Sequence, residues 1–203
     1  TLVEDTNHPA PVEIRVGVDA GSRDWVATIE NVIAGTDGLR KTGAGTLVLT
    51  ASNTYTGGTE IVGGVLSVSS DANLGDAGGA LTFNGGILRV TGDSFTSTAR
   101  DIVWGANGGG FDIASAGNTF TVFQSLDAGG SLRKQGDGTL VLTGANSYTG
   151  GTLVEAGTLI GNVASIRGDI GNAGTVVFDQ ATDATFDGDI AGFGSIDGQM
   201  VKQ

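Results

Sequence analysis

The chain has 203 residues, of which 22 are acidic, 10 are basic and 37 are glycine, and its net charge is −12. The absence of cysteine excludes disulfides and cysteine-based catalytic or metal sites, and the sparse, unclustered basic residues argue against a nucleic-acid partner. Hydrophobic residues make up 39% of the chain, which is too many for a disordered glycine-rich linker, so we expect a folded protein.

Short apolar runs separated by turn residues predict strands throughout, because glycines interrupt every window long enough for a helix. In chain order the predicted strands are 12–18, 45–50, 63–68, 79–90, 118–123, 138–143, 157–162 and 174–179. Alternate positions are more strictly apolar and are expected to point inward. These positions are Leu47, Leu49, Leu66, Val68, Leu81, Phe83, Leu88, Val90, Leu140, Leu142, Val176 and Phe178. The positions between them, such as Val48, Ser67, Arg89 and Val177, are expected to point outward.

The spacing of these strands distinguishes between all-β architectures. Comparable strands recur at Leu47, Leu66 and Leu88, close to one every 20 residues. Antiparallel hairpins would repeat about every 8–12 residues, whereas one turn of a parallel β-helix takes about 20 or more. The spacing therefore predicts a right-handed parallel β-helix of about ten coils, roughly 50 Å long at ~4.8 Å per coil. We expect residues 1–203 to form one such domain.

Two thirty-residue segments, 39–68 and 132–161, are identical at 18 of 30 positions and predict a structural repeat. Within each, two glycines fit a tight corner before the strand GTLVLT (Gly43, Gly45, Gly136 and Gly138). The next corner, NTYTGGT or NSYTGGT, begins with Asn53 or Asn146, which suits a left-handed or side-chain-capped turn. The last residues, from Met200 to Gln203, match the start of the unit and predict a third copy beginning near residue 200.

The pattern G-x-G-T-L-x-L-T-G-x-N-x-Y-T-G-G-T resembles the autotransporter-associated β-strand repeat of type V secreted passenger domains. The main departure is Ala51, because the family has glycine at this position. The second copy has the expected glycine there, Gly144. The resemblance implies a right-handed β-helix that folds outside the cell. It also implies export by an outer-membrane β-barrel, C-terminal in the same polypeptide. The passenger would lie on the bacterial surface, either anchored to the outer membrane or released by cleavage.

From the duplicated motif and the lack of a catalytic set of residues, we expect a stalk or adhesin that contacts a host-cell or extracellular-matrix ligand and contributes to virulence. The chain has no initiator methionine and no recognisable signal peptide, so we expect a fragment of a longer protein. We expect the passenger segment to be monomeric. A phage-fibre-like solenoid is an alternative, and it predicts a trimer instead.

Few residues suggest chemistry. His8 is the sole histidine, which excludes a multi-histidine metal site and a Ser-His-Asp triad. We expect no catalytic residue, metal or cofactor. A polysaccharide-cleaving β-helix enzyme is the alternative, because such enzymes use clustered carboxylates. Its candidate residues, which also fit ordinary turns, are Asp169, Asp179, Asp183, Asp187, Asp189 and Asp197.

Five side chains are candidates for surface recognition: Trp25, Tyr55, Arg89, Trp104 and Tyr148. Both tryptophans follow an Arg-Asp pair, in SRDW and RDIVW, a combination found at binding hot spots and also at packed strand ends. The two tyrosines either pack over the turn or offer a binding surface. Specific recognition is also expected in the segment 71–131, which separates the two copies and resembles neither.

Overall fold

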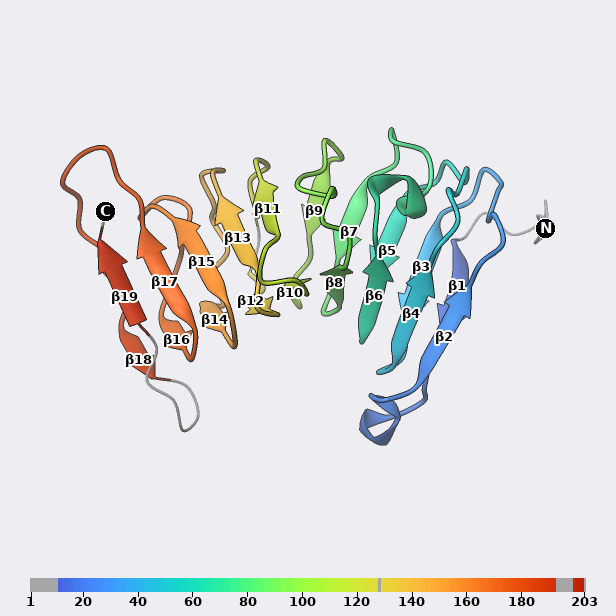
Figure 1. Cartoon of the computed structure of the whole chain (residues 1–203), viewed down its shortest axis with the longest axis horizontal. Coiled ribbons are helices and arrows are strands. Elements are labelled where there is room, and N and C mark those ends of the chain that lie inside the picture. Colours follow the sequence, from blue (N-terminus) through green and yellow to red (C-terminus); the bar gives the residue numbers. More distant parts are fainter. Residues whose placement is uncertain (1–10, 128, 193–198, 203) are drawn as a thin grey trace.

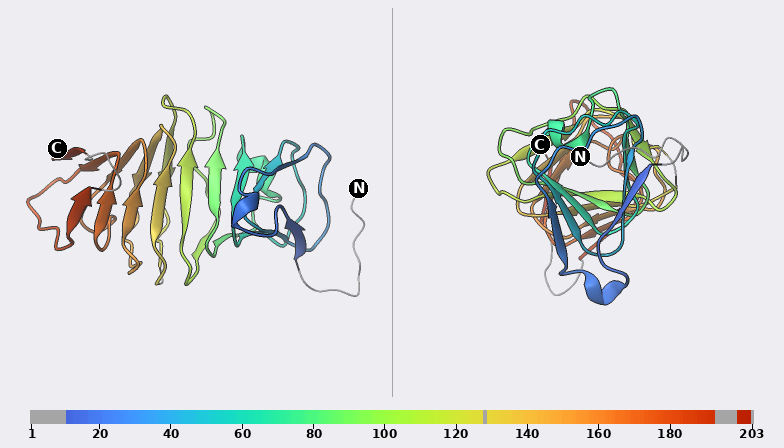
Figure 2. Two further views of the ribbon diagram at one scale, coloured as in Figure 1. Left: turned by 90° about the horizontal axis from the view of Figure 1, so that it is seen from below. Right: turned by 90° about the vertical axis from the view of Figure 1, so that its right-hand side faces the viewer.

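A computed structural model describes residues 11–127, 129–192 and 199–202, without the side chains of Ala20 and residues 199–202. The described chain winds around one axis as an all-β solenoid of three parallel sheets, as Figures 1 and 2 show. Two short 3₁₀ helices, η1 (Ala20–Ser22) and η2 (Asp71–Leu74), lie in connecting loops. In this part of the chain, no helix has the length and apolarity needed to cross a membrane.

The central sheet runs the length of the solenoid, and the other two sheets each cover half of it. The N-terminal sheet contains β1 (Val12–Arg15), β3 (Leu39–Thr42), β5 (Thr59–Ile61), β7 (Leu81–Phe83) and β9 (Ile102–Trp104). The central sheet contains β2 (Val26–Ile29), β4 (Thr46–Leu49), β6 (Val65–Val68), β8 (Ile87–Val90), β10 (Gly109–Ile113), β12 (Leu132–Gln135), β14 (Thr152–Val154), β16 (Ile170–Asn172) and β18 (Ile190–Gly192). The C-terminal sheet contains β11 (Thr119–Val122), β13 (Thr139–Leu142), β15 (Thr158–Gly161), β17 (Thr175–Phe178) and β19 (Gln199–Lys202).

The predicted parallel β-helix is confirmed, but the predicted number of coils was too high. The nine described strands of the central sheet are joined by eight turns, which corresponds to roughly 38 Å at ~4.8 Å per strand. Loops such as the one carrying η2 lengthen individual coils, so fewer coils fit in the same chain.

Every side chain predicted to point inward is buried, including Leu47, Leu66, Leu88 and Leu140, each at 0% exposure. These side chains belong to one continuous core that runs along the axis, because equivalent residues of successive coils stack in register. Two positions predicted to point outward, Ser67 and Val177, are buried as well. Ser67 is flanked in the ladder by Val48 and Arg89, and such larger neighbours readily cover a small side chain.

One coil changes the path of the chain around the axis. The coil from β9 to β11 contributes a strand to all three sheets, whereas the other coils contribute to two. An aromatic cluster fills the interior here, with Phe83 against Trp104 at 5.1 Å and Phe111 at 5.0 Å, measured between ring centroids. Phe120 continues it, 6.0 Å from Phe111. Large rings suit a coil with a strand on every side, which encloses more space than short aliphatic side chains fill.

The two copies of the repeat consequently occupy different sides of the solenoid. The strand LRK is β3 of the N-terminal sheet in the first copy and β12 of the central sheet in the second. The strand TLVL is correspondingly β4 of the central sheet and β13 of the C-terminal sheet. The residues predicted to begin a third copy form β19, in the C-terminal sheet, and Gln203 lies outside the described residues. That a third copy begins there stays a prediction.

Candidate functional site: the interlocked repeat

Each repeat buries a lysine that the sequence analysis did not single out. The Nζ atom of Lys41 donates hydrogen bonds to the carbonyls of Thr42 (2.8 Å), Gly43 (3.0 Å) and Gly63 (2.9 Å). Lys134 repeats the arrangement, donating to Gln135, Gly136 and Ala156 at 2.7, 2.7 and 3.1 Å. Because Gly63 and Ala156 belong to the following coil, each ammonium ties the corner of one coil to the next.

The burial of these lysines has an electrostatic cost. Desolvation lowers the pKa of Lys41 to about 8 and the pKa of Lys134 to about 8 as well. Nearby Asp112 and Asp137 act in the opposite direction on Lys134. The alternation of the strand could have predicted the burial of this lysine, since Lys41 is two residues after Leu39 and therefore lies on the same inward face.

A buried asparagine links three consecutive coils in each repeat. Oδ1 of Asn53 accepts a hydrogen bond from the amide of Ile33 (2.8 Å), and its Nδ2 donates to the carbonyl of Asn73 (2.6 Å). Asn146 bonds in the same way to the amide of Leu126 (2.7 Å) and the carbonyl of Ser165 (2.6 Å). Each of these bonds reaches a backbone group 19 or 20 residues away, so the asparagine side chain joins coils instead of capping its own turn.

Tyr55 and Tyr148 follow these asparagines by two residues and are buried, at 2% and 1% exposure. The packing interpretation is therefore right, and neither tyrosine offers a binding surface. The hydroxyl of Tyr55 is 2.7 Å from Oγ1 of Thr59, which donates its own proton to the carbonyl of Leu74. Tyr55 is therefore the donor in this pair. Desolvation raises the pKa of Tyr55 to about 12, and it also raises the pKa of Tyr148, whose contacts match.

Glycines permit the corners to stack closely. Gly43 has φ of +78° and Gly136 has φ of +72°, and a Cβ at either would collide with the backbone of the preceding coil. Gly58 and Gly151 have φ of +81° and +78° at the second corner. A left-handed backbone disfavours any other residue there, so the repeated glycines are explained by coil stacking.

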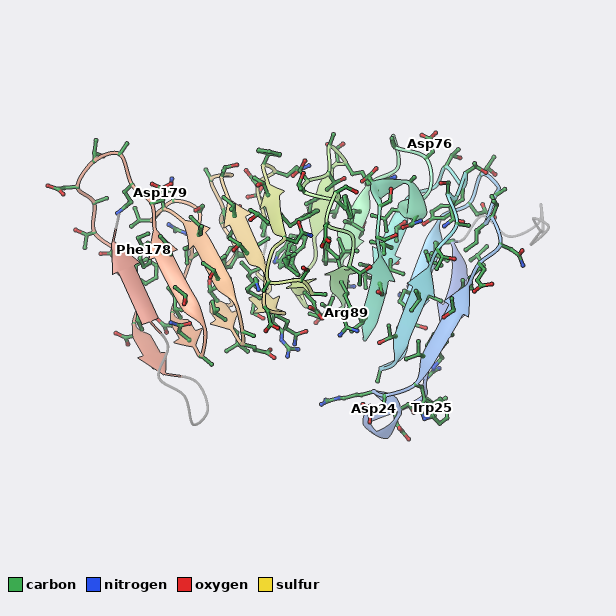
Figure 3. All side chains as sticks on the ribbon, in the orientation of Figure 1. Asp24, Trp25, Asp76, Arg89, Phe178 and Asp179 are labelled. Carbon is green, nitrogen blue, oxygen red and sulfur yellow. The ribbon has the colours of Figure 1, made fainter. Side chains whose placement is uncertain are left out.

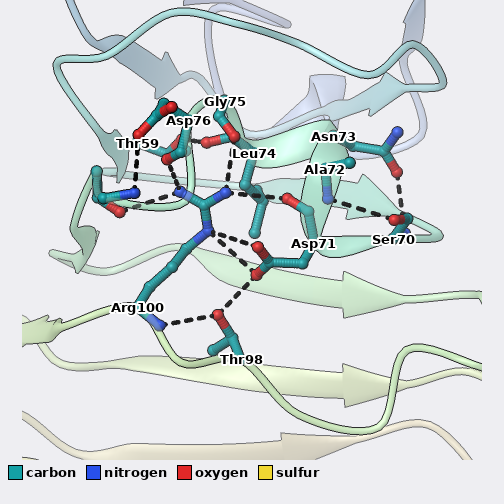
Figure 4. Close-up of polar contacts among 12 residues, drawn as sticks. Thr59, Ser70, Asp71, Ala72, Asn73, Leu74, Gly75, Asp76, Thr98 and Arg100 are labelled. Atoms are coloured by element: carbon teal, nitrogen blue, oxygen red, sulfur yellow. Dashed lines mark hydrogen bonds and ion pairs between the residues drawn. The ribbon is translucent and has the colours of Figure 1, made fainter.

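A further polar cluster holds the loop that contains η2, and no sequence pattern predicts it. Arg100, 2% exposed, inserts its guanidinium into the loop 71–79, as Figure 4 shows. Its Nε is 3.1 Å from Oδ1 of Asp71, and its other nitrogens donate to four backbone carbonyls: those of Asp71, Gly75, Asp76 and Gly79, at 2.6–3.1 Å. All five guanidinium donors are used, which fixes the loop against the following coil.

The remaining candidates for recognition lie in different environments. Trp25 is 58% exposed and follows η1 on a loop that projects from the solenoid in Figure 3. Arg89 is half-exposed, and its Nε pairs with Oδ2 of Asp112 at 2.6 Å. Trp104 was predicted as a candidate wrongly, because it is 4% exposed and packs into the aromatic cluster. Trp104 is the third residue of strand β9 and points inward. Trp25 lies immediately before strand β2 and is therefore outside the alternation of that strand.

Only some of the C-terminal aspartates lie together, and the amide of Asp189 donates to one of these, Asp169. Asp169 and Asp187 line the same hollow, of about 280 Å³, together with Arg167. Asp179 stands directly after β17, at the start of the loop that leads to β18, whereas Asp187 stands near the end of that loop (Figure 3 labels Asp179). Asp197 lies outside the described residues. Within the described ranges, no three acidic or histidine side chains form a group suited to a metal ion.

Comparison with known proteins places these features in context. The model of the passenger-associated transport repeat matches residues 39–68 and 132–160. Over 198 residues, 96% of the chain is 41% identical to the adhesin BmaC autotransporter of Brucella suis biovar 1 (strain 1330). The probable autotransporter YfaL of Escherichia coli (strain K12) is 32% identical over 178 residues, 74% of the chain. The chain spans only 6% and 14% of the lengths of these two proteins. No solved structure matches it.

Proposed function

The chain is part of an autotransporter passenger domain with passenger-associated transport repeats, and from this premise we propose that it is a non-catalytic segment of a surface adhesin. Its ligand would be a component of the host-cell surface or the extracellular matrix, and its contact would contribute to virulence. The observation that carries the proposal is the similarity to an adhesin along nearly the whole chain, well beyond the two repeats.

The interlocked coils suit this role mechanically. The lysine and asparagine contacts of each repeat join neighbouring coils through buried hydrogen bonds, which resist shear better than solvated ones. A solenoid stiffened in this way holds its loops at a defined distance from the cell. We propose export through an outer-membrane β-barrel of the same polypeptide, surface anchoring or later release, and a monomeric passenger without nucleic-acid partners.

The loop 17–25 is the part of the surface that we propose makes the contact. Trp25, the next residue Val26, and Val18 near the start of the loop are 58%, 65% and 66% exposed. An exposed tryptophan beside Arg23 and Asp24 combines a large apolar face with charged groups for orientation. Trp104, the second tryptophan of the chain, is excluded by its packing.

Display of the passenger on a non-adherent bacterial strain tests the proposal. Cells that display it should adhere to cultured host cells or to immobilised matrix proteins, and cells with an empty display system should not. Trp25→Ala should lower adherence several-fold, whereas Val32→Ala is the control, because Val32 is 48% exposed and lies outside both the loop 17–25 and the segment 71–131. Equal adherence of displaying and empty cells would refute the adhesive role.

The non-catalytic part of the proposal has its own test. The purified chain should release no reducing ends from a panel of polysaccharides. Release that Asp187→Asn abolishes would contradict it, because Asp187 lies with Asp169 and Arg167 in one hollow.

A further inference from the structure

One flank of the second repeat is hollowed along the axis. A hollow of about 410 Å³ is lined by Ser131, Thr149, Gly151, Leu153 and Asp169, among others. The hollow of about 280 Å³ adjoins it, shares Asp169, and adds Arg167 and Phe186. We call these two hollows together the repeat groove.

The groove crosses successive coils. Ser131, Gly151 and Asp169 each stand immediately before a strand of the central sheet. The backbone connects them, since the amide of Leu132 donates to Gly151 (3.0 Å) and the amide of Thr152 donates to Asp169 (2.8 Å). Equivalent positions on neighbouring coils are ~4.8 Å apart, so the groove presents a regular series of positions to an extended, linear ligand.

The first repeat provides an internal comparison. Its equivalent residues before the strands are Gly38, Gly58 and Ala80, because the amide of Leu39 donates to Gly58 and the amide of Thr59 donates to Ala80, both at 2.9 Å. Position 153 corresponds to Glu60. On a common backbone, the second copy thus has a hydroxyl in place of glycine, a carboxylate in place of alanine, and leucine in place of glutamate.

These groups are available to a ligand. Oδ1 of Asp169 accepts the amide of Asp189 (3.0 Å), and Asp169 is an exposed residue. Ser131 and Thr149 add hydroxyls that both donate and accept, and Gly150 and Gly151 add no side chain to the lining of the groove. Leu153 and Phe186 supply apolar surface along the same flank.

We propose that the repeat groove binds a linear, uncharged glycan. Sugar rings alternate hydroxyl groups, which carboxylates and hydroxyls bind, with C–H faces, which pack on leucine and phenylalanine. A linear chain of such rings fits a groove that extends along the axis. The net charge of −12 repels anionic chains, and Arg167 is the single basic residue of the groove among those described. This inference goes beyond the adhesive role and does not require it, because it concerns direct binding by the isolated chain.

The test is titration of the full chain, labelled with ¹⁵N, with uncharged hexasaccharides: cellohexaose, chitohexaose and mannohexaose. We expect the amide signals of Gly150, Gly151 and Asp169 to shift with at least one of them at millimolar concentration. The signals of Gly57, Gly58 and Ala80 should stay in place and serve as the internal reference.

The variant S131G/D169A gives the second copy the residues of the first, which this fold already accommodates, so it should fold normally by circular dichroism. It should weaken binding at least about tenfold, equivalent to about 1.4 kcal/mol. Absence of shifts with every hexasaccharide, or shifts that persist in the variant, would overturn the inference, as would stronger binding of a heparin hexasaccharide. Failure here with adherence intact would refute glycan binding alone, whereas shifts without adherence would refute only the adhesin.

Discussion

Replacing Asn53 by alanine should disconnect three consecutive coils at one point. The substitution removes the acceptor of the Ile33 amide and the donor to the Asn73 carbonyl, which are bonded at 2.8 and 2.6 Å in a buried position. Alanine fills less space, and the cavity is enclosed by the neighbouring coils. Both backbone groups would then lack a partner unless water entered.

The expected loss of stability follows from these two groups. An unsatisfied buried donor or acceptor costs about 1–3 kcal/mol, so two of them cost about 2–6 kcal/mol, and we expect about 3 kcal/mol after partial relaxation. Asn146→Ala should cost about the same, because its side chain makes the equivalent bonds to Leu126 and Ser165. Asn107→Ala is the control: Asn107 is exposed and bonds only to Oδ1 of Asn84, so its loss should stay within about 0.5 kcal/mol.

Urea unfolding gives the overall change in the free energy of unfolding. Because solenoids can unfold in parts, hydrogen exchange of the Ile33 amide is the sharper measurement. In Asn53→Ala that amide should exchange at least about a hundredfold faster, as expected for a local loss of about 3 kcal/mol. If Asn53→Ala and Asn107→Ala cost the same, or if exchange at Ile33 is unchanged, the asparagine does not connect the coils.

Three further predictions concern the other contacts of the repeat and its neighbouring loop. Because burial lowers the pKa of Lys41 and Lys134 to about 8, the unfolded chain binds more protons between pH 8 and about 10.4, so stability should rise over that window. Above pH 10 it should fall, since the native state keeps the proton of Tyr55, with a pKa of about 12, while the unfolded state loses it; urea midpoints against pH would show the maximum near pH 10. Gly43→Ala should lower the free energy of unfolding by more than about 2 kcal/mol, since φ is +78° and the added Cβ meets the preceding coil. Arg100→Lys should lower it by about 2–4 kcal/mol in urea unfolding, because three donors replace five at four buried carbonyls and Asp71.

Each of these predictions has a matched control. The double variant K41M/K134M should lose the rise between pH 8 and 10, and a rise that persists would show that other groups cause it. Gly117→Ala should be tolerated, because a Cβ there approaches only Oγ of Ser115, at 4.0 Å. Arg133→Lys should cost under about 1 kcal/mol, because its pair with Glu155 is partly exposed to solvent.

The repetition of this unit has a physical explanation in the contacts that cross its coils. Lys41 and Asn53 each reach a neighbouring coil, and their counterparts in the second copy do so with nearly the same distances. The unit supplies its own contacts to whichever coils flank it, and the flanking partners are mainly backbone groups. It therefore works on any side of the solenoid, which is why the two copies can lie on different sheets.

Local sequence patterns were enough to predict the class of fold, the strand positions that point inward and the turns between the strands. Alternation of residues such as Leu47 and Leu49, and the glycines before them, are local features whose consequences depend on the next few residues only. The repeat pattern also identified the family, because its residues are fixed by stacking rather than by a particular ligand.

The contacts between residues of different coils could be identified only in the folded chain. Arg100 lies 29 residues from Asp71, and Asn53 lies 20 residues from both Ile33 and Asn73, separations set by the length of each coil and not by any local pattern. The same holds for the three-stranded coil from Ile102 to Val122, which moves the second repeat to the next sheet. It also holds for the tryptophans, since similar segments leave Trp25 exposed and bury Trp104. Coil length and register arise from the stacking of all the coils together, so they become visible only once the chain is folded.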